Sequence, residues 1–391
     1  MAFRPLKNYL LAPGPTAVPA EVLLRIAAPT IHHRTPQFEQ IVAGVREQLK
    51  QVFQTAGDVL VLASSGTGAM EASITNTLSP GDPVLCVNGG KFGERWMKMC
   101  RSYGLDVEEL AVEWGRAVEP SAIAAALERR PKTRAVLVQA SETSTTVLHP
   151  IEAIAKLTRE RDTLLMVDGI TAVGVTDVPM DRWGIDVLVS GSQKAFMLPP
   201  GLAFIALSER AWAASETAKL PRFYFDLRRE RTNLHQNTTA YTPAINLIYG
   251  LSQALTSMLD EGLPSIFERC DRLMRATRAG ATAIGLGLVA PDSPSPAVTG
   301  VFMPDGVDGG KLQKYLRNTL GVEVAGGQDQ FKGKVLRIAH LGYTGDFDTL
   351  TMLAALELAL SRFGVPIEFG RGVGAAQKIL AETLPPGAAR A

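Results

Sequence analysis

The sequence predicts an α/β protein, with a mostly parallel sheet covered by helices on both faces and a smaller α+β domain after it. Over the first two thirds of the chain, short apolar runs alternate with helical patterns, as in strand–helix repeats. Three of the runs (134–139, 163–168 and 186–191) are continuous and rich in Val and Leu, which is typical of strands buried on both faces. From about residue 262 onward, strand and helix patterns are mixed, which predicts a second, smaller unit.

The elements of the first two thirds follow from these patterns. A helix is expected from Pro36, because Thr35 suits the N-cap and apolar residues at helical spacing continue to Val52. Elsewhere, short apolar runs predict strands and the stretches between them predict helices. The further strands are expected at 58–63, 83–88, 106–111 and 201–208, and the helices from Gly66, over about 91–103 and over about 120–130.

The last third is less regular. The segment 222–242 is polar and irregular, and the tail after 375, which ends in LPPGAARA, is expected to be frayed. Between them the patterns predict helices at about 243–260, 264–284, 309–319 and 346–363, and strands at 297–303 and 334–340.

Composition and charge disfavour several classes of protein. The net charge is +1 and the basic residues are spread along the chain, so no nucleic-acid or anionic-membrane partner is expected. The three cysteines, Cys86, Cys100 and Cys270, have no metal-ligand spacing, and their odd number argues against a disulfide framework. No apolar run approaches 18 residues and the N-terminus does not resemble a signal peptide, so we expect a cytoplasmic protein.

Three features carry potential chemistry, and each also has an ordinary structural explanation. The Gly-Thr-Gly turn at 66–68 presents free backbone N–H groups at a helix N-terminus, where phosphate binds well, although a ligand-free turn has the same sequence. Asp168 would lie at the carboxyl edge of the sheet, where it could pair with a cationic ring nitrogen or a metal, or cap a helix. Lys194, flanked by apolar residues, is either kept reactive by desolvation or extended toward solvent.

The order of these features is informative. A phosphate site, an acid at a strand end and a lysine 26 positions later form the order that pyridoxal-5′-phosphate (PLP) chemistry needs. With its surrounding motifs, the chain resembles the class V aminotransferases of PLP fold type I, in particular the alanine–glyoxylate and serine–pyruvate aminotransferase group. The resemblance covers nearly the whole chain. The matching segments are LLAPGPTAVP (10–19), SGTGAMEA (65–72), VNGGKFGERW (87–96), SETSTTVLHP (141–150), VDGITAVG (167–174), SGSQKA (190–195), YTPA (241–244) and GKVLRIAHLG (333–342).

The resemblance implies a fold and a domain organisation. Fold type I has a mostly parallel, seven-stranded sheet in a large PLP-binding domain, expected here at 21–261. A smaller C-terminal α+β domain is expected at 262–391. The segment 1–20 is expected to cross to the partner subunit or to the small domain. The resemblance also implies a homodimer with a shared active site.

The resemblance further implies roles for individual residues. Lys194 would bind PLP covalently and move the proton, and Asp168 would pair with the pyridine nitrogen. Arg337 would bind the substrate α-carboxylate, with Gly14 and Arg34 also at the substrate. The other cofactor contacts would come from Thr67, Gly68, Ala69 and Gln193 at the phosphate, Phe92 and Ile170 on the two ring faces, Thr143 near the ring oxygen or Asp168, and Thr239, Tyr241 or Thr242 of the neighbouring subunit.

The implied reaction is transamination of small amino acids, from alanine, serine or a similar donor to a 2-oxo acid such as glyoxylate or pyruvate. Arg337 is the one basic residue with an implied carboxylate role, so small neutral donors are expected over aspartate or glutamate. Ala69 stands where some relatives have His, Thr146 replaces a common Gly, and His33-Arg34 also echoes phosphoserine aminotransferases. A PLP lyase, a phosphoserine-type aminotransferase and a non-catalytic complex subunit are the alternatives. A cysteine desulfurase is disfavoured, because Cys270 falls in a helical pattern.

Overall fold

The computed structural model describes residues 7–382, and its main feature is a seven-stranded sheet with the order β2-β10-β9-β8-β5-β3-β4. Within this sheet β10 runs antiparallel to both of its neighbours, while the other strands share one direction. The expectation of a mostly parallel, seven-stranded sheet is therefore confirmed. The strands are β2 (Val59–Leu62), β3 (Pro83–Asn88), β4 (Asp106–Ala111), β5 (Ala135–Gln139), β8 (Leu164–Asp168), β9 (Val187–Gly191) and β10 (Ala203–Leu207).

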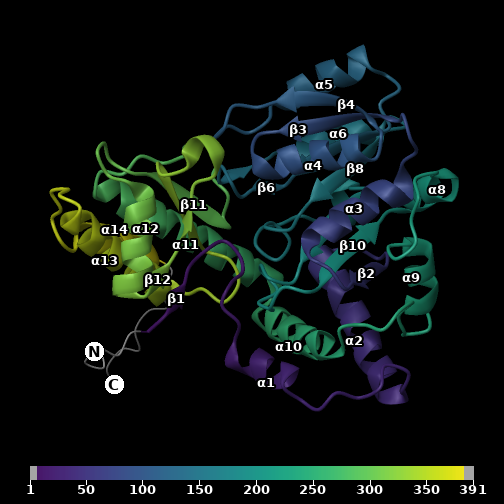
Figure 1. Cartoon of the computed structure of the whole chain (residues 1–391), viewed down its shortest axis with the longest axis horizontal. Helices are drawn as coiled ribbons and strands as arrows, with labels where there is room; N and C mark the ends of the chain where they lie inside the picture. The colour runs from purple at the N-terminus through teal and green to yellow at the C-terminus, as the bar shows by residue number, and fades with distance from the viewer. Residues whose placement is uncertain (1–6, 383–391) are drawn as a thin grey trace.

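Helices surround this sheet (Figure 1). α3 packs on β9 and β10, α4 on β3, β4 and β5, and α6 on β8, so the central strands are buried along their whole length. The helices of this region are α1 (Ala20–Ile26), α2 (Pro36–Phe53), α3 (Gly66–Thr77), α4 (Lys91–Ser102), α5 (Pro120–Arg129), α6 (Ile151–Arg159), α7 (Met180–Trp183), α8 (Glu209–Thr217), α9 (Leu227–Leu234) and α10 (Ile245–Glu261). A short hairpin, β6 (Ser141–Glu142) and β7 (Val147–Leu148), follows β5.

The C-terminal region has its own antiparallel sheet, in the order β11-β14-β13, and a separate apolar core that includes Leu312, Leu336 and Leu356. Its elements are α11 (Leu263–Ala283), β11 (Val298–Phe302), α12 (Gly309–Tyr315), a π-helical turn (Leu316–Leu320), β12 (Val322–Glu323), β13 (Ala325–Gly326), a 3₁₀ turn (Asp329–Phe331), β14 (Val335–Ala339), α13 (Asp346–Arg362) and α14 (Arg371–Ala381).

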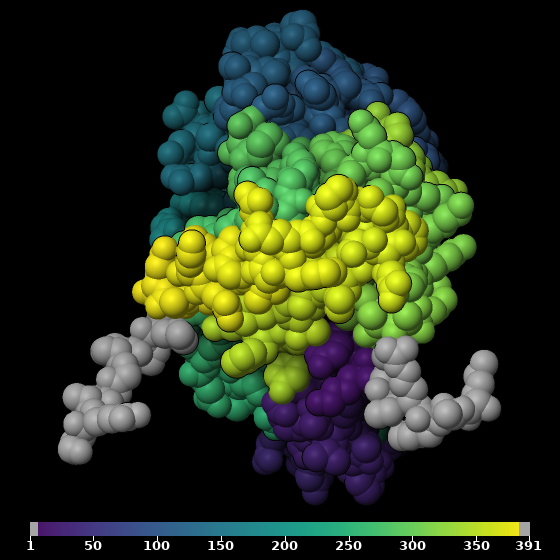
Figure 2. Space-filling model, turned by 90° about the vertical axis from the view of Figure 1, so that its left-hand side faces the viewer, coloured from purple at the N-terminus to yellow at the C-terminus, as the bar shows by residue number. Residues whose placement is uncertain are grey.

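The N-terminal segment lies against this C-terminal region. β1 (Tyr9–Leu10) pairs in parallel with β12, and Figure 2 shows the N-terminal residues in purple below the green and yellow C-terminal face. The sequence-based boundaries after residues 20 and 261 stay a prediction, and residues 1–6 lie outside the described part of the chain. Within residues 7–382, no helix combines the length and the apolar character that crossing a membrane requires.

The structure differs from the sequence expectations in two segments. The polar stretch 222–242 contains α9, whose first turn is capped by the Asp226 carboxylate, which accepts hydrogen bonds from the backbone N–H groups of Arg228 and Arg229. Only Leu227 and Leu234 of this helix are buried, so its apolar pattern is too sparse to detect. The tail after 375 is not frayed up to residue 381, because α14 packs against α11 and α13 through residues such as Leu380. Residues 383–391 lie outside the described part.

Candidate active site

Two strands of the central sheet bring Asp168 and Lys194 to the same edge. Asp168 is the last residue of β8, directly beside Gln139 at the end of β5. The neighbouring strand β9 ends at Gly191, three positions before Lys194. Because β5, β8 and β9 are parallel, their carboxyl ends meet at one edge, where open α/β sheets bind their ligands.

Lys194 is held in a partly buried position by the N-terminal segment. Its Nζ donates a hydrogen bond to the carbonyl oxygen of Pro13, and its side chain lies against Gly14. Burial, together with the positive charges of Arg337 and Arg95, lowers the pKa of Lys194 to about 8, against the opposing effect of Asp168. At pH 7 about a tenth of this amine is therefore uncharged, far more than for an ordinary lysine, and the uncharged form is the one that attacks a carbonyl carbon.

Asp168 is buried, with one carboxylate oxygen engaged. Burial raises its pKa to about 6, against the lowering effects of a 2.9 Å hydrogen bond from the backbone N–H of Ile170 and of the charges of Arg95 and Lys194. No other hydrogen bond to its carboxylate occurs within residues 7–382. A cationic N–H placed at the second oxygen would favour the ionised carboxylate, as required of the partner of a protonated ring nitrogen.

The N-terminus of α3 forms a cradle suited to a phosphate. No side chain caps its first N–H groups, and of these the Gly68 N–H already donates to the carbonyl oxygen of Ser65 at 2.8 Å. The surroundings are tight, because a Cβ on Gly66 would overlap Ile170 and one on Gly68 would lie 2.6 Å from Ser64 Oγ. Thr67 and Ala69 belong to the same helical turn. A bulkier residue at either glycine would therefore fill the space beside the helix end.

Gln193 places a buried amide oxygen, unpartnered within the described chain, beside this helix end. Its Oε1 is buried and has no hydrogen-bond partner within residues 7–382. A Cβ built on Gly191 would lie 3.3 Å from this oxygen and 3.4 Å from the backbone nitrogen of Gly66, so Gln193 lies close to the start of α3. Buried polar groups without partners are rare in native proteins, and a ligand that engages this amide is one explanation.

Arg337 lies in the middle of β14 and reaches across to the SETSTTVLHP loop. Its Nε donates to the carbonyl of Gly326 at 2.9 Å and its Nη1 to the carbonyl of Thr143 at 3.1 Å. Nη2 makes no hydrogen bond within the described chain, so it remains available to a carboxylate. Burial lowers the pKa of Arg337 to about 10, against the effect of Glu142, and the side chain stays cationic at neutral pH.

Phe92 and Thr143 have partners that the sequence did not indicate. Phe92, in the first turn of α4, is half-buried, and its backbone N–H donates to Glu142 Oε2 at 3.1 Å. The Thr143 hydroxyl is hydrogen-bonded to the Thr171 hydroxyl at 2.7 Å rather than to Asp168. Thr143 therefore connects the hairpin loop to the segment that follows β8.

Glu142 is a site residue that the sequence reasoning missed. Its buried carboxylate accepts hydrogen bonds from the backbone N–H groups of Phe92, Gly93 and Ser144 and from the Ser144 hydroxyl. Burial raises its pKa, against these hydrogen bonds, and its charge acts on both Asp168 and Arg337. The available signal was a single acid inside a loop that is otherwise rich in Ser and Thr. Arg95 was also missed; it hydrogen-bonds Thr67 Oγ1 at 3.0 Å.

The structure does not bring Arg34, Thr239, Tyr241 and Thr242 to this cluster. Arg34 donates to Thr238 Oγ1 at 3.0 Å and to the carbonyl of Thr239 at 3.5 Å. Tyr241 stacks on Tyr224, with ring centroids 5.0 Å apart. No hydrogen bond, ion pair or ring contact in residues 7–382 joins these four residues to Lys194, Asp168 or Arg337.

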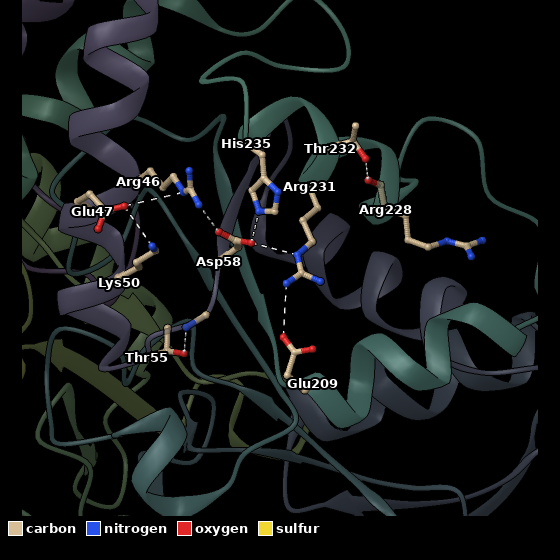
Figure 3. Close-up of polar contacts among 11 residues, drawn as sticks. Arg46, Glu47, Lys50, Thr55, Asp58, Glu209, Arg228, Arg231, Thr232 and His235 are labelled. Carbon is tan, nitrogen blue, oxygen red and sulfur yellow. Dashed lines mark hydrogen bonds and ion pairs between the residues drawn. The ribbon is translucent and has the colours of Figure 1, made fainter.

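An ion-pair cluster fixes the helix that precedes this segment. Asp58, at the start of β2, accepts hydrogen bonds from Arg46 of α2 at 3.0 Å, from Arg231 of α9 at 3.0 Å and from His235 at 2.7 Å (Figure 3). Burial alone would raise the pKa of Asp58, but the bonds from His235 and Arg231 outweigh it and lower the pKa. The cluster thereby attaches α9, and the chain after it, to the central sheet.

Metal-ligating side chains do not gather elsewhere in the described chain. Within residues 7–382 there is no group of three or more His, Cys, Asp or Glu residues arranged to hold a metal ion. Cys270 is fully buried in α11, where burial raises its pKa to about 12. Cys86 and Cys100 are also buried, with their sulfurs 4.0 Å apart.

Comparison with known proteins agrees with this geometry. The family model for class V aminotransferases matches residues 8–338. The chain is 45% identical over 379 residues to a protein of Synechococcus sp. (strain PCC 6716) named soluble hydrogenase, small subunit, covering 96% of this chain and 98% of that protein. It is 39% identical to L-aspartate–glyoxylate aminotransferase of Paracoccus denitrificans (strain Pd 1222), covering 96% and 97%.

A solved structure shows the same fold. The crystal structure of ureidoglycine–glyoxylate aminotransferase from Bacillus subtilis superimposes with a TM-score of 0.92 at 30% identity, covering 97% of this chain and 100% of that one. The sequence motifs, the arrangement of Lys194, Asp168 and Arg337 and the match along most of the chain lead to one conclusion. The chain belongs to the class V aminotransferase family.

Proposed function

We propose that this protein is a PLP-dependent aminotransferase that passes the amino group of a small neutral amino acid, such as alanine or serine, to a 2-oxo acid such as glyoxylate or pyruvate. One observation carries the proposal: an amine with a lowered pKa, a buried acid with a free oxygen and a buried guanidinium with a free donor meet at one sheet edge. These three groups come from separate segments, around β8, after β9 and within β14.

The residues present fit each part of PLP. The α3 N-terminus, Thr67, Gly68, Ala69 and the unpartnered Gln193 amide would hold the phosphate. Phe92 and Ile170 would flank the ring, with Thr143 near its oxygen, and Asp168 would hold the ring nitrogen protonated. Lys194 would bind the aldehyde carbon. When bound, PLP supplies an electron sink for the bonds at the substrate α-carbon.

The chain's own groups would then position the substrate and move its proton. Arg337 would bind the α-carboxylate through Nη2, since Nε and Nη1 are already held by the carbonyls of Gly326 and Thr143. Lys194 Nζ would take the proton from the substrate α-carbon and return it during transfer, a task for which a pKa of about 8 is suited. Gly14 leaves room for the lysine side chain to move between these positions.

A homodimer with shared active sites accounts for the remaining predicted residues. Within residues 7–382, no hydrogen bond, ion pair or ring contact joins Thr239, Tyr241 or Thr242 to the Lys194 cluster, and the neighbouring Phe223 is 75% exposed. Phe223 and Tyr224 are both exposed and pack against Tyr241, and a contiguous exposed apolar patch of this kind is typical of a surface that binds another protein. We propose that this surface, with Arg34 beside it, faces the active site of the second subunit.

Two alternatives have specific support. The name of the Paracoccus relative favours aspartate as a donor, and the name of the Synechococcus relative favours a role as a subunit of a larger complex. Only Arg337 of the cluster offers a free donor to a carboxylate, which favours neutral donors over aspartate. The three convergent catalytic groups favour an enzyme over a scaffold.

Half-reaction spectroscopy tests the proposal. The PLP-loaded protein is mixed with single amino acids, and conversion of the bound cofactor to its amine form is followed by absorbance. Alanine and serine should react at least about a hundredfold faster than aspartate or glutamate, because a second buried carboxylate would lack a partner. Asp168→Asn should retain PLP yet slow the conversion about a hundredfold or more. If no amino acid converted the bound cofactor to its amine form, the proposal would be contradicted. If aspartate converted it faster than alanine and serine, aspartate would be the preferred donor instead.

A further inference from the structure

Arg95 contacts two parts of the chain that we propose to bind the cofactor, the start of α3 and Phe92 of α4. It is one helical turn after Phe92 on α4, the spacing at which side chains of a helix meet. Its Nη1 donates to Thr67 Oγ1 at 3.0 Å, and its Cζ lies 4.8 Å from the centroid of the Phe92 ring. One guanidinium therefore touches both the expected phosphate cradle and the expected ring-stacking residue.

Arg95 is not directly paired with an acid in the described part of the chain, although its charge helps to lower the pKa of Asp168. The other cations of α4 have carboxylate partners, because Lys91 and Lys98 pair with Glu94 and Arg101 approaches Glu109. Arg95 makes no ion pair within residues 7–382. Its position in the N-terminal half of the helix also gains nothing from the helix dipole, which favours cations at the C-terminus. Its location is therefore better explained by a negative group that the chain itself does not supply.

The contact with Thr67 has a direct consequence for an anion. When Arg95 donates to Thr67 Oγ1, that oxygen acts as an acceptor and the hydroxyl proton is free to be donated elsewhere. Thr67 lies in the first turn of α3, where no side chain caps the backbone N–H groups. A phosphate at this helix end would accept a hydrogen bond from the Thr67 hydroxyl. The Arg95 guanidinium would then lie behind the Thr67 side chain, which would separate it from the phosphate.

The contact with Phe92 has a consequence for the ring. A guanidinium over an aromatic face holds the ring in one orientation through cation–π attraction. Phe92 is also fixed from its backbone by Glu142. The face opposite Arg95 is the one that remains for a stacked cofactor ring.

We propose that Arg95 is a positioning residue for PLP, which orients the Thr67 hydroxyl toward the cofactor phosphate and supports the Phe92 ring that stacks on the pyridine. This inference rests on the proposed function, because it concerns the same cofactor. The competing explanation is that Arg95 only lines a surface cavity of about 600 Å³ beside α4, together with Glu71, Lys98 and Tyr103. That explanation predicts no effect of Arg95 on the cofactor.

Cofactor affinity separates the two explanations. The apoprotein is titrated with PLP, and with pyridoxal, which lacks the phosphate, while binding is followed by fluorescence. Arg95→Gln should weaken PLP about tenfold to a hundredfold, from the loss of a charge near the phosphate and of one cation–π contact. The loss should be smaller for pyridoxal, which can use only the ring contact. Arg95→Lys keeps the charge and should recover part of the PLP affinity.

Arg101→Gln is the matched control, because Arg101 is on the same helix, is 57% exposed and lies away from Thr67 and Phe92. It should bind PLP like the wild type. The visible circular dichroism of bound PLP, which reports the tilt of its ring, should change in Arg95→Gln and not in the control. The melting temperature of the Arg95→Gln apoprotein should stay close to that of the wild type, because the side chain makes no ion pair.

The outcomes are distinct. Unchanged PLP affinity in Arg95→Gln overturns the inference and leaves the proposed function intact. If Arg95→Gln weakened the binding of PLP and of pyridoxal equally, Arg95 would not act through the phosphate. A large drop in melting temperature with unchanged PLP affinity shows a structural role instead. Failure of the wild-type protein to bind PLP overturns both the inference and the proposed function.

Discussion

Gly14 lies directly against Lys194, and any Cβ at this position would overlap the lysine side chain. The adjacent Pro13 carbonyl accepts the hydrogen bond from Lys194 Nζ. The N-terminal segment therefore forms one wall of the active site while it is also anchored to the C-terminal region through β1 and β12. Lys194 is thus enclosed by parts of the chain that lie about 180 positions apart in sequence.

Gly14→Ala should displace Lys194 and reduce covalent binding of PLP. Gly14 also has a φ of +121°, a backbone conformation that side chains rarely adopt, so the substitution is strained in two ways. Overpacking of this kind costs about 1–3 kcal/mol of stability, measurable by urea unfolding. Gly44→Ala is the control, since a Cβ there meets nothing in the middle of α2 and should be neutral or stabilising. Equal behaviour of the two variants would contradict this account.

Arg337→Ala should lower kcat/KM for every amino-acid substrate together, about a hundredfold or more, because it removes the charged partner of a buried carboxylate. Arg337→Lys keeps the positive charge but lacks the bidentate guanidinium, so it should lose less activity than Arg337→Ala. The control is Arg317→Ala, at an exposed arginine outside the site. Steady-state kinetics with alanine, serine, aspartate and glutamate provide the measurement. If glutamate, aspartate or phosphoserine outcompeted alanine and serine, and Arg34→Ala abolished that preference, the small-neutral assignment would be wrong.

Much of the fold follows from local patterns, whereas the site does not. β3 and β9 occupy nearly the residues that their apolar runs predict, because buried strands leave a continuous signal. Helix α2 begins at Pro36 as expected, yet Thr35 does not cap it, since its hydroxyl donates to the His32 carbonyl. Whether the hydroxyl accepts from a helix N–H or donates to a nearby carbonyl leaves no trace in the sequence.

The site was predictable where a motif carries it and not where distant loops meet. Lys194, Asp168 and Arg337 were identified from the motifs around them, and the structure places them together. Glu142 and Arg95 were missed, because their partners come from segments 28 to 50 positions away. Thr146 was recognised as a departure from glycine, but only the structure shows that it adopts a φ of +60°, the left-handed region that glycine favours.

Stability should depend on pH through His149, which is buried and accepts a hydrogen bond at Nδ1 from the Val118 N–H at 3.0 Å. Burial lowers the pKa of His149 to about 4, whereas the unfolded chain has a value near 6.5. Below pH 6.5 the unfolded chain therefore binds a proton that the folded protein excludes, and stability falls. The stability difference between wild type and His149→Gln should shrink by about 1.4 kcal/mol per pH unit from 6.5 to about 4. A difference that urea unfolding finds independent of pH would refute this assignment.

Asp58→Asn should destabilise the protein by about 1–3 kcal/mol, because it removes the negative charge and one of the two buried carboxylate oxygens that accept from Arg46, Arg231 and His235 (Figure 3). The pKa of Asp58 is lowered in the folded state, so its contribution is complete above about pH 4 and is lost as the pH falls through the lowered value. Glu47→Gln is the control: this acid is 64% exposed and its loss should change stability by less than about 0.5 kcal/mol. Thermal unfolding of both variants gives the comparison, and equal effects would show that the Asp58 cluster is not a structural anchor.

The proposal that Lys194 binds PLP covalently can be tested directly by identifying the modified lysine. The PLP-loaded protein is treated with borohydride, which fixes the cofactor covalently, and the modified peptide is then identified by mass spectrometry. A single adduct is expected on Lys194, the amine whose pKa is lowered to about 8 beside Asp168 and Arg337. An adduct on any other lysine, or a wild-type protein that binds no PLP, would contradict it.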